Sequence, residues 1–147
     1  MYKKILVGLD GSKHALKAAQ TAIEVARKFD SELHLLTVTR PYKASPELLH
    51  YLKAESLLGE PKYVMDEMTQ NIVDEAKHLA ADAGLKKIKT VVREGKPART
   101  LTAYAKNHHI DMIFLGSRGV GELEATLLGS VSGKVGMLAA CSVTLVR

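Results

Sequence analysis

The chain has 147 residues, of which 46% are hydrophobic and 25% are charged, and its formal net charge is +5. Such a composition is typical of a globular protein and argues against a disordered, fibrous or disulfide-rich chain. The length suits one domain, which we expect to span residues 1–147. Lys and Arg are spread along the sequence without a long basic run, so nucleic acid is not an expected partner.

The sequence carries no signal for export or for a membrane span. Its basic start, Met1 to Lys4, is followed by an apolar run that already ends at Asp10, which is too short for a signal peptide. No other run is long enough to cross a bilayer. The single cysteine, Cys141, has no intrachain partner for a disulfide. We therefore expect a cytoplasmic protein with no membrane partner.

The first quarter of the chain predicts a strand, a helix and a second strand. The run "KKILVGLD" (residues 3–10) has the apolar character of a short buried strand, and "DGS" then marks a turn and a helix start. With Ser12 as N-cap, the helix extends to about Phe29, because apolar residues recur every three or four positions. The run "ELHLLTV" (residues 32–38) is the second strand.

The middle of the chain begins with a long connection, Arg40 to Lys62, that carries three prolines. It fits either a lid or partner surface, or an ordered surface loop with a short helix. A helical pattern over residues 63–83 follows and is closed by Gly84. The run "KKIKTVVR" (residues 86–93) is the third strand.

The last third of the chain predicts two more helix and strand pairs. Pro97 suits the first turn of a helix that ends near Asn107, and "DMIFLG" (residues 111–116) is the fourth strand. Residues 130–140 form the last helix and "SVTLVR" (residues 142–147) the fifth strand. This alternation predicts an α/β fold: a five-stranded parallel sheet of order 3-2-1-4-5 with helices on both faces, which is Rossmann-like.

In this architecture the ligand crevice lies beyond the carboxyl ends of strands one and four, where the winding reverses. Two glycine-containing segments converge there: "GLDGS", with Gly8 and Asp10, and "GSRGVG", with Gly116, Arg118 and Gly119. Glycines let main-chain N–H groups approach phosphate oxygens. The last helix adds an N-terminus that favours anions, formed by Gly129, Ser130, Val131 and Ser132.

The familiar phosphate-binding patterns do not match. A Walker A loop requires a glycine where Leu128 stands and Ser or Thr where Val135 stands, and the dinucleotide pattern fails at Glu124. Taken alone, Asp10 is equally consistent with a turn residue and a ligand, and Arg118 with a solvated arginine and a phosphate ligand.

The pattern that does match is Gly116-x2-Gly119-x9-Gly129-Ser130. With this spacing the sequence resembles the ATP-binding branch of the universal stress protein family. The resemblance covers the entire chain, including "KILVGLDGSKHA", "REGKPARTLTAYAKNHHIDMIFLGSRG", "GSVSGKV" and "CSVTLVR". It departs at Ser142, where the family often has proline after the cysteine. The resemblance implies an adenine nucleotide alpha hydrolase-like fold, and a homodimer.

The resemblance also implies roles for individual residues. Asp10 would lie near the ribose and the metal-linked phosphates of ATP bound with Mg²⁺, and the main chain of Val38 would meet the adenine edge. Leu115 and Gly116 would line the nucleoside pocket, and Gly119 would admit the phosphates. The phosphates would be bound by Gly129, Ser130, Val131 and Ser132.

Other reactive residues have plainer explanations. The six histidines lack metal-ligand spacing, so no metal site is expected in the protein itself, and Cys141 is expected to be a small buried residue. Basic residues on and around the third strand protect an exposed sheet edge: Lys86, Lys87, Lys89, Arg93 and Lys96. The fifth strand lacks such charges, so Val143 to Arg147 is the expected homodimer contact.

The leading functional hypothesis is a homodimeric ATP-binding stress protein in which nucleotide occupancy switches a conformation or a surface for an unknown downstream protein partner. A second hypothesis is slow ATP hydrolysis or phosphate transfer at the same site, for which Asp10 is the one obvious nearby carboxylate. A third, a nucleotide-independent dimerisation or chaperone-like module, is disfavoured by the intact glycine spacing.

Overall fold

The computed structural model describes residues 1–40, 47, 61–118 and 129–147. The five strands are β1 (Lys4–Leu9), β2 (Glu32–Thr39), β3 (Ile88–Glu94), β4 (Met112–Gly116) and β5 (Ser142–Val146), and all of their pairings are parallel. The order β3-β2-β1-β4-β5 is the one that the sequence predicts. The winding therefore reverses between β1 and β4.

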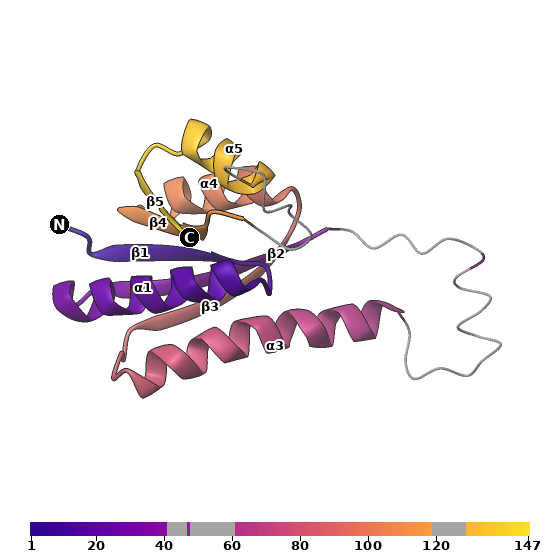
Figure 1. Ribbon diagram of the computed structural model, residues 1–147, viewed down its shortest axis with the longest axis horizontal. Coiled ribbons are helices and arrows are strands. Elements are labelled where there is room, and N and C mark those ends of the chain that lie inside the picture. The colour runs from indigo at the N-terminus through magenta and orange to yellow at the C-terminus, as the bar shows by residue number, and fades with distance from the viewer. Residues whose placement is uncertain (41–46, 48–60, 119–128) are drawn as a thin grey trace.

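Helices cover both faces of the sheet (Figure 1). One face carries α1 (Lys13–Phe29) and α3 (Pro61–Asp82), and the other carries α4 (Pro97–Asn107) and α5 (Ser130–Leu138). Among the described helices, none is both long enough and apolar enough to cross a bilayer.

The strands divide the core in two because their side chains alternate between the two faces. Ile5, Val7 and Phe114 pack under α1 and α3, whereas Leu6 and Ile113 pack under α4 and α5. Most residues of the three central strands are buried because both faces of these strands are covered. β3 differs, since it lies at an edge of the sheet and most of its residues are exposed.

Local signals explain the helix ends. Ser12 caps α1 as predicted: its Oγ accepts a hydrogen bond from Ala15 N at 3.1 Å. Gly84 follows α3 in the left-handed region, with a φ of +89°, and Pro97 opens α4.

Several predicted boundaries are shifted. α3 begins at Pro61 and not at residue 63, and α5 ends at Leu138 and not at residue 140. β3 begins at Ile88, because Lys86 and Lys87 lie in the connection before it. Most of the segment 40–62 lies outside the described residues, so its predicted role as a lid or a surface loop stays a prediction.

Candidate functional site

A cleft opens at the carboxyl end of the sheet, between the ends of β1 and β4. It holds about 570 Å³ including its open mouth. The described residues that line it come from strands, helices and turns far apart in the sequence: Gly8, Leu9, Asp10, Ala15, Leu36, Val38, Pro97, Leu101, Leu115, Gly116, Arg118, Gly129, Val131 and Ser132.

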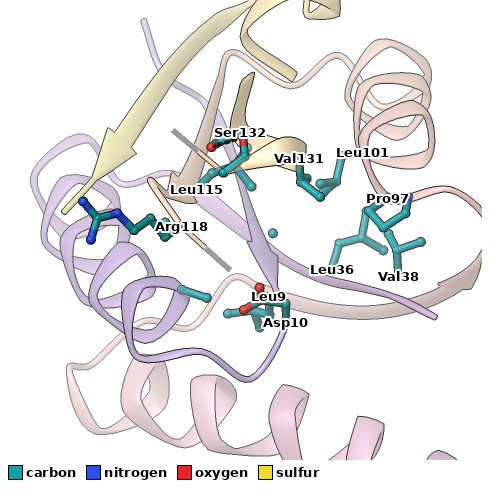
Figure 2. Close-up of a pocket in the computed structure, with 14 residues that line it drawn as sticks. Leu9, Asp10, Leu36, Val38, Pro97, Leu101, Leu115, Arg118, Val131 and Ser132 are labelled. Carbon is teal, nitrogen blue, oxygen red and sulfur yellow. Dashed lines mark hydrogen bonds between the residues drawn. The ribbon is translucent and has the colours of Figure 1, made fainter. Parts of the chain in front are cut away.

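The cleft has one apolar side. Leu36 and Val38 come from the end of β2, Pro97 and Leu101 from the first turns of α4, and Figure 2 shows these side chains grouped together. Leu101 is only 3% exposed, so this wall is continuous with the core beneath α4. A flat apolar ring fits such a wall because its faces need no hydrogen-bond partners.

The opposite side of the cleft is polar. Asp10 follows β1 directly, and its Oδ1 accepts a hydrogen bond from Ser12 N at 2.9 Å. This bond fixes the turn that leads into α1, which places the carboxylate at the mouth of the cleft (Figure 2).

The N-terminus of α5 opens into the cleft next to Val131. Its N-cap residue is Gly129, and no side chain among the described residues caps it. Gly133 N already bonds Gly129 O at 3.0 Å, but the N–H groups of Val131 and Ser132 precede the first possible intrahelical acceptor. These two amides, with the positive end of the helix dipole, are suited to an anion.

Ser132 holds this helix end in place. Its side chain is buried, and its Oγ lies 3.0 Å from Ser117 O and 3.1 Å from Gly129 O. The hydroxyl donates its proton to one of these two carbonyl oxygens. Gly129 N donates to Ser117 O at 2.6 Å. Because the hydroxyl has one proton and donates it to a carbonyl, the donor of Ser132 that remains for a ligand is the backbone N–H.

Gly116 is required by close packing. A Cβ at this position would lie 2.7 Å from the carbonyl carbon of His14 and 2.8 Å from Ala15 N, in the first turn of α1. The missing side chain therefore lets the end of β4 approach the start of α1. Gly8 is also crowded, although there the nearest atom is the flexible side chain of Leu115, at 2.5 Å.

Most of the predicted site residues meet at this cleft. The lining includes Gly8, Asp10, Val38, Leu115, Gly116, Arg118, Gly129, Val131 and Ser132. Ser130 begins α5 but is exposed and not part of the lining. The guanidinium of Arg118 points away from Leu36 and Val38 (Figure 2). Gly119 lies outside the described residues.

The residues that sequence reasoning missed are chiefly apolar: Leu9, Ala15, Leu36, Pro97 and Leu101. The periodic apolar face of α4 was the available signal for Leu101, but it does not distinguish a cleft wall from ordinary core. No group of His, Cys, Asp and Glu in the described parts of the chain could by itself hold a metal ion.

Cys141 lies before β5 and is partly buried. Burial raises the pKa of its thiol, which disfavours the reactive thiolate.

A second polar cluster lies under the other end of α4 and was not predicted. His34 is completely buried; its Nε2 lies 2.6 Å from Glu32 Oε1 and its Nδ1 lies 2.7 Å from the hydroxyl of Tyr104. An ionised carboxylate can only accept, so Nε2–H donates to Glu32 and the Tyr104 hydroxyl donates to Nδ1. Lys89 Nζ, 3.2 Å from the same Glu32 oxygen, completes the cluster.

The pKa values in this cluster follow from burial and from these bonds. Burial lowers the pKa of His34 more than the hydrogen bond to Glu32 raises it, so the neutral ring is favoured. Burial acts to raise the pKa of Glu32, but the hydrogen bonds from His34 and Lys89 outweigh it and lower that pKa. Burial raises the pKa of Tyr104.

The parallel sheet, its strand order and the cleft at the reversal of winding define a Rossmann-like α/β protein with a cleft where this architecture binds ligands. The model of the universal stress protein family matches residues 1–147. The chain belongs to this family.

Individual relatives agree with that assignment. Universal stress protein YxiE of Bacillus subtilis is 32% identical over 154 aligned residues, and the alignment covers 100% of both chains. Among solved structures, the universal stress protein UspA from Lactobacillus plantarum has a TM-score of 0.75 and 30% identity, covering 99% of this chain and 98% of its own. A universal stress protein in complex with cAMP has a TM-score of 0.70 and 26% identity, with 99% and 97% covered.

Proposed function

We propose that this protein is a cytoplasmic, homodimeric ATP-binding stress protein in which nucleotide occupancy of the cleft switches a conformation or partner surface. The observation that carries the proposal is the N-terminus of α5, whose Val131 and Ser132 amides lack intrahelical acceptors and open into a cleft that also has an apolar wall. The complex of a related universal stress protein with cAMP supports an adenine nucleotide as the ligand.

The cleft matches the three parts of an adenine nucleotide. The adenine ring would lie against the apolar wall of Leu36, Val38 and Leu101, with the end of β2 offering its main chain to the ring edge. The ribose would lie near Asp10, since a carboxylate accepts well from hydroxyl groups. The phosphates would then reach the α5 amides, which bind anions without a cationic side chain.

Mg²⁺ has a defined place in this proposal. Asp10 is the one carboxylate among the described lining residues, and its negative charge would repel bare phosphates. Mg²⁺ typically binds one or two carboxylates together with substrate phosphates and water. Asp10 would hold the ion in this way, and the ion would neutralise charge between the carboxylate and the phosphates.

The proposed homodimer would form through β5. This strand lies at the edge of the sheet opposite β3, and Val143 and Leu145 are only partly buried in the single chain. Met137 and Leu138, at the end of α5 just before it, are 87% and 56% exposed. A second copy of the chain would cover this apolar surface.

The test of nucleotide binding uses two variants at Gly129 that differ mainly in charge. The backbone there has φ −68° and ψ 162°, which both Asn and Asp adopt readily at a helix N-cap. Both Gly129→Asn and Gly129→Asp place a capping oxygen at α5, but only Asp also places a negative charge at the proposed phosphate site. Calorimetry of the nucleotide-free proteins with MgATP should show binding at least about tenfold weaker for Asp than for Asn.

Thermal melts without nucleotide provide the control, because two folded variants of similar stability separate binding from folding. Equal ATP affinity in the parent and both variants would contradict the proposed site. Parallel titrations with ADP, AMP and cAMP, each with and without Mg²⁺, define the ligand. ATP that stays intact for hours on the protein favours the switch, whereas phosphate release that is lost in Asp10→Asn favours slow hydrolysis.

A further inference from the structure

A groove on the flank of α4 is separate from the nucleotide cleft. It lies between α4 and the edge strand β3, because α4 packs over β2 and against α5 and leaves this part of the β3 face open. The described residues that line it are Arg93, Arg99, Thr100, Ala103, Tyr104, Asn107 and His108. None of them lines the cleft.

Tyr104 forms the floor of the groove and is fixed by contacts to residues of the core and at the end of α4. The hydroxyl of Tyr104 is anchored to buried His34 at 2.7 Å, and the ring of Tyr104 stacks on His108 with centroids 3.9 Å apart. The guanidinium carbon of Arg93 lies 6.0 Å from the centroid of the Tyr104 ring. Tyr104 is 6% exposed, so this surface is preformed and costs little ordering on binding.

The charge of the groove comes from arginines. Two of the lysines predicted to protect the β3 edge are neutralised within the chain: Lys87 Nζ lies 2.9 Å from Asp30 Oδ2, and Lys89 Nζ lies 3.2 Å from Glu32 Oε1. Arg93 and Arg99 form no salt bridge within the described part of the chain, and none of the described lining residues is a carboxylate. The groove therefore presents two guanidinium groups that form no ion pair with a described carboxylate.

The groove borders the outer edge of β3, which pairs with no further strand among the described residues. Lys87 O accepts from Leu33 N and Gly95 N donates to Thr39 O, both at 2.8 Å, so odd-numbered residues turn their backbone groups toward β2. The backbone N–H and C=O groups of Ile88, Thr90, Val92 and Glu94 therefore point outward. Arg93 Nη1 donates to Val92 O at 3.3 Å and covers one of these acceptors.

We propose that an acidic, extended segment of a partner protein binds here by pairing with the outer edge of β3. Its backbone would meet the outward groups of Thr90 and Val92, and its carboxylates on the α4 side would meet Arg93 and Arg99. Arg93 would leave Val92 O for the stronger carboxylate. Nucleic acid is less well matched, because it could use the arginines but not the row of backbone donors and acceptors.

The experiment measures binding of a fluorescent peptide of alternating Glu and Val by anisotropy. The parent should bind it, and Arg93→Glu/Arg99→Glu should weaken binding about tenfold or more. Lys106→Glu, a charge reversal on α4 outside the groove, should change the affinity by less than about twofold because the charge is screened there. The same peptide with all of its amides N-methylated should bind at least about tenfold more weakly, since it has no N–H group left to pair with a strand.

Hydrogen exchange supplies a second measurement. The amides of Thr90 and Val92 should exchange more slowly when the acidic peptide is bound. The proposal is overturned by no binding at millimolar peptide, by equal binding of the N-methylated peptide, or by equal loss in Lys106→Glu. Tighter binding of single-stranded oligo-uridine than of the peptide, lost in the same double variant, would instead show a nucleic-acid surface and would also overturn it.

Discussion

The polar groups near the two ends of helix α4 differ in whether their hydrogen bonds are satisfied within the protein. At its C-terminal end, Tyr104 joins His34 and Glu32 in a buried cluster in which the polar atoms are hydrogen-bonded to one another. At its N-terminal end, Leu101 borders a cleft into which the amides of Val131 and Ser132 open without an intrahelical acceptor. The first arrangement stabilises the fold, and the second leaves donors for a ligand.

This contrast separates polar groups that stabilise the fold from polar groups that are available to a ligand, and it does so without sequence motifs. A closed cluster has nothing left to offer a ligand, so its loss should reduce stability and leave nucleotide binding intact. An open helix end contributes little to stability, so changes there should affect binding first. Variants at the two ends of α4 should therefore differ in whether they affect stability or nucleotide binding.

The largest effect is expected at Gly116, where the cleft depends on close packing rather than on a polar bond. In Gly116→Val the new side chain would overlap the main chain of His14 and Ala15, at contacts of 2.7 and 2.8 Å for the Cβ alone. We expect the free energy of unfolding to fall by about 3 kcal/mol or more, measured in urea. Gly133→Ala is the control, because its Cβ would meet no described atom within 4 Å and should not destabilise α5.

A smaller effect is expected from opening the closed cluster. Tyr104→Phe leaves His34 Nδ1 without its donor, and His34→Leu leaves the Tyr104 hydroxyl without its acceptor. Each change should cost about 1–3 kcal/mol of unfolding free energy. The double variant should cost less than the sum of the two, because it removes both partners of one buried bond. If the loss in the double variant equals the sum of the two single losses, His34 and Tyr104 do not stabilise each other through this bond.

MgATP affinity supplies the comparison for these variants. It should stay within about threefold of the parent in Tyr104→Phe, because no atom of the cluster lines the cleft. A large loss of affinity in a variant that remains folded would mean that the two ends of α4 are not independent.

The smallest effect is a pH dependence of stability that resides in the cluster. Burial lowers the pKa of His34 in the folded protein, so the unfolded chain takes up a proton first as the pH falls. Stability from this group is present above the ordinary histidine pKa of about 6.5 and is lost as the pH falls below it, by at most about 1.4 kcal/mol per pH unit.

Urea unfolding between neutral and mildly acidic pH measures this slope. His34→Leu should reduce the slope relative to the parent, because it removes the group whose pKa burial lowers. Identical slopes in the parent and in His34→Leu would contradict the assignment.

The sequence predicted the fold because its strands are short apolar runs that alternate with amphipathic helices, and the rules for parallel sheets then leave few topologies. The same rules brought Asp10 and Gly116 to one crevice, although they are far apart in the chain. The start of the third strand was placed too early, because the charged residues Lys86 and Lys87 precede the apolar residues of the strand without a turn signal between them.

Contacts between side chains distant in sequence were beyond such reasoning. His34 and Tyr104 are 70 positions apart, and neither belongs to a pattern that pairs them. The hydrogen bond from the Ser132 hydroxyl to Ser117 O, which holds the start of α5 in place, depends on where Ser117 O lies, and no local pattern specifies that position. The packing requirement at Gly116 depends in the same way on the approach of α1.

An amide-resolved NMR titration of the nucleotide-free protein with MgATP tests directly whether nucleotide binds at the N-terminus of α5. Bound ATP should cause large shifts for the N–H groups of Val131 and Ser132, together with Val38 at the apolar wall, and little change in the ring signals of His34. Val131 and Ser132 amides that do not respond to saturating ATP, or a response centred on His34 and Tyr104, would contradict binding at this site.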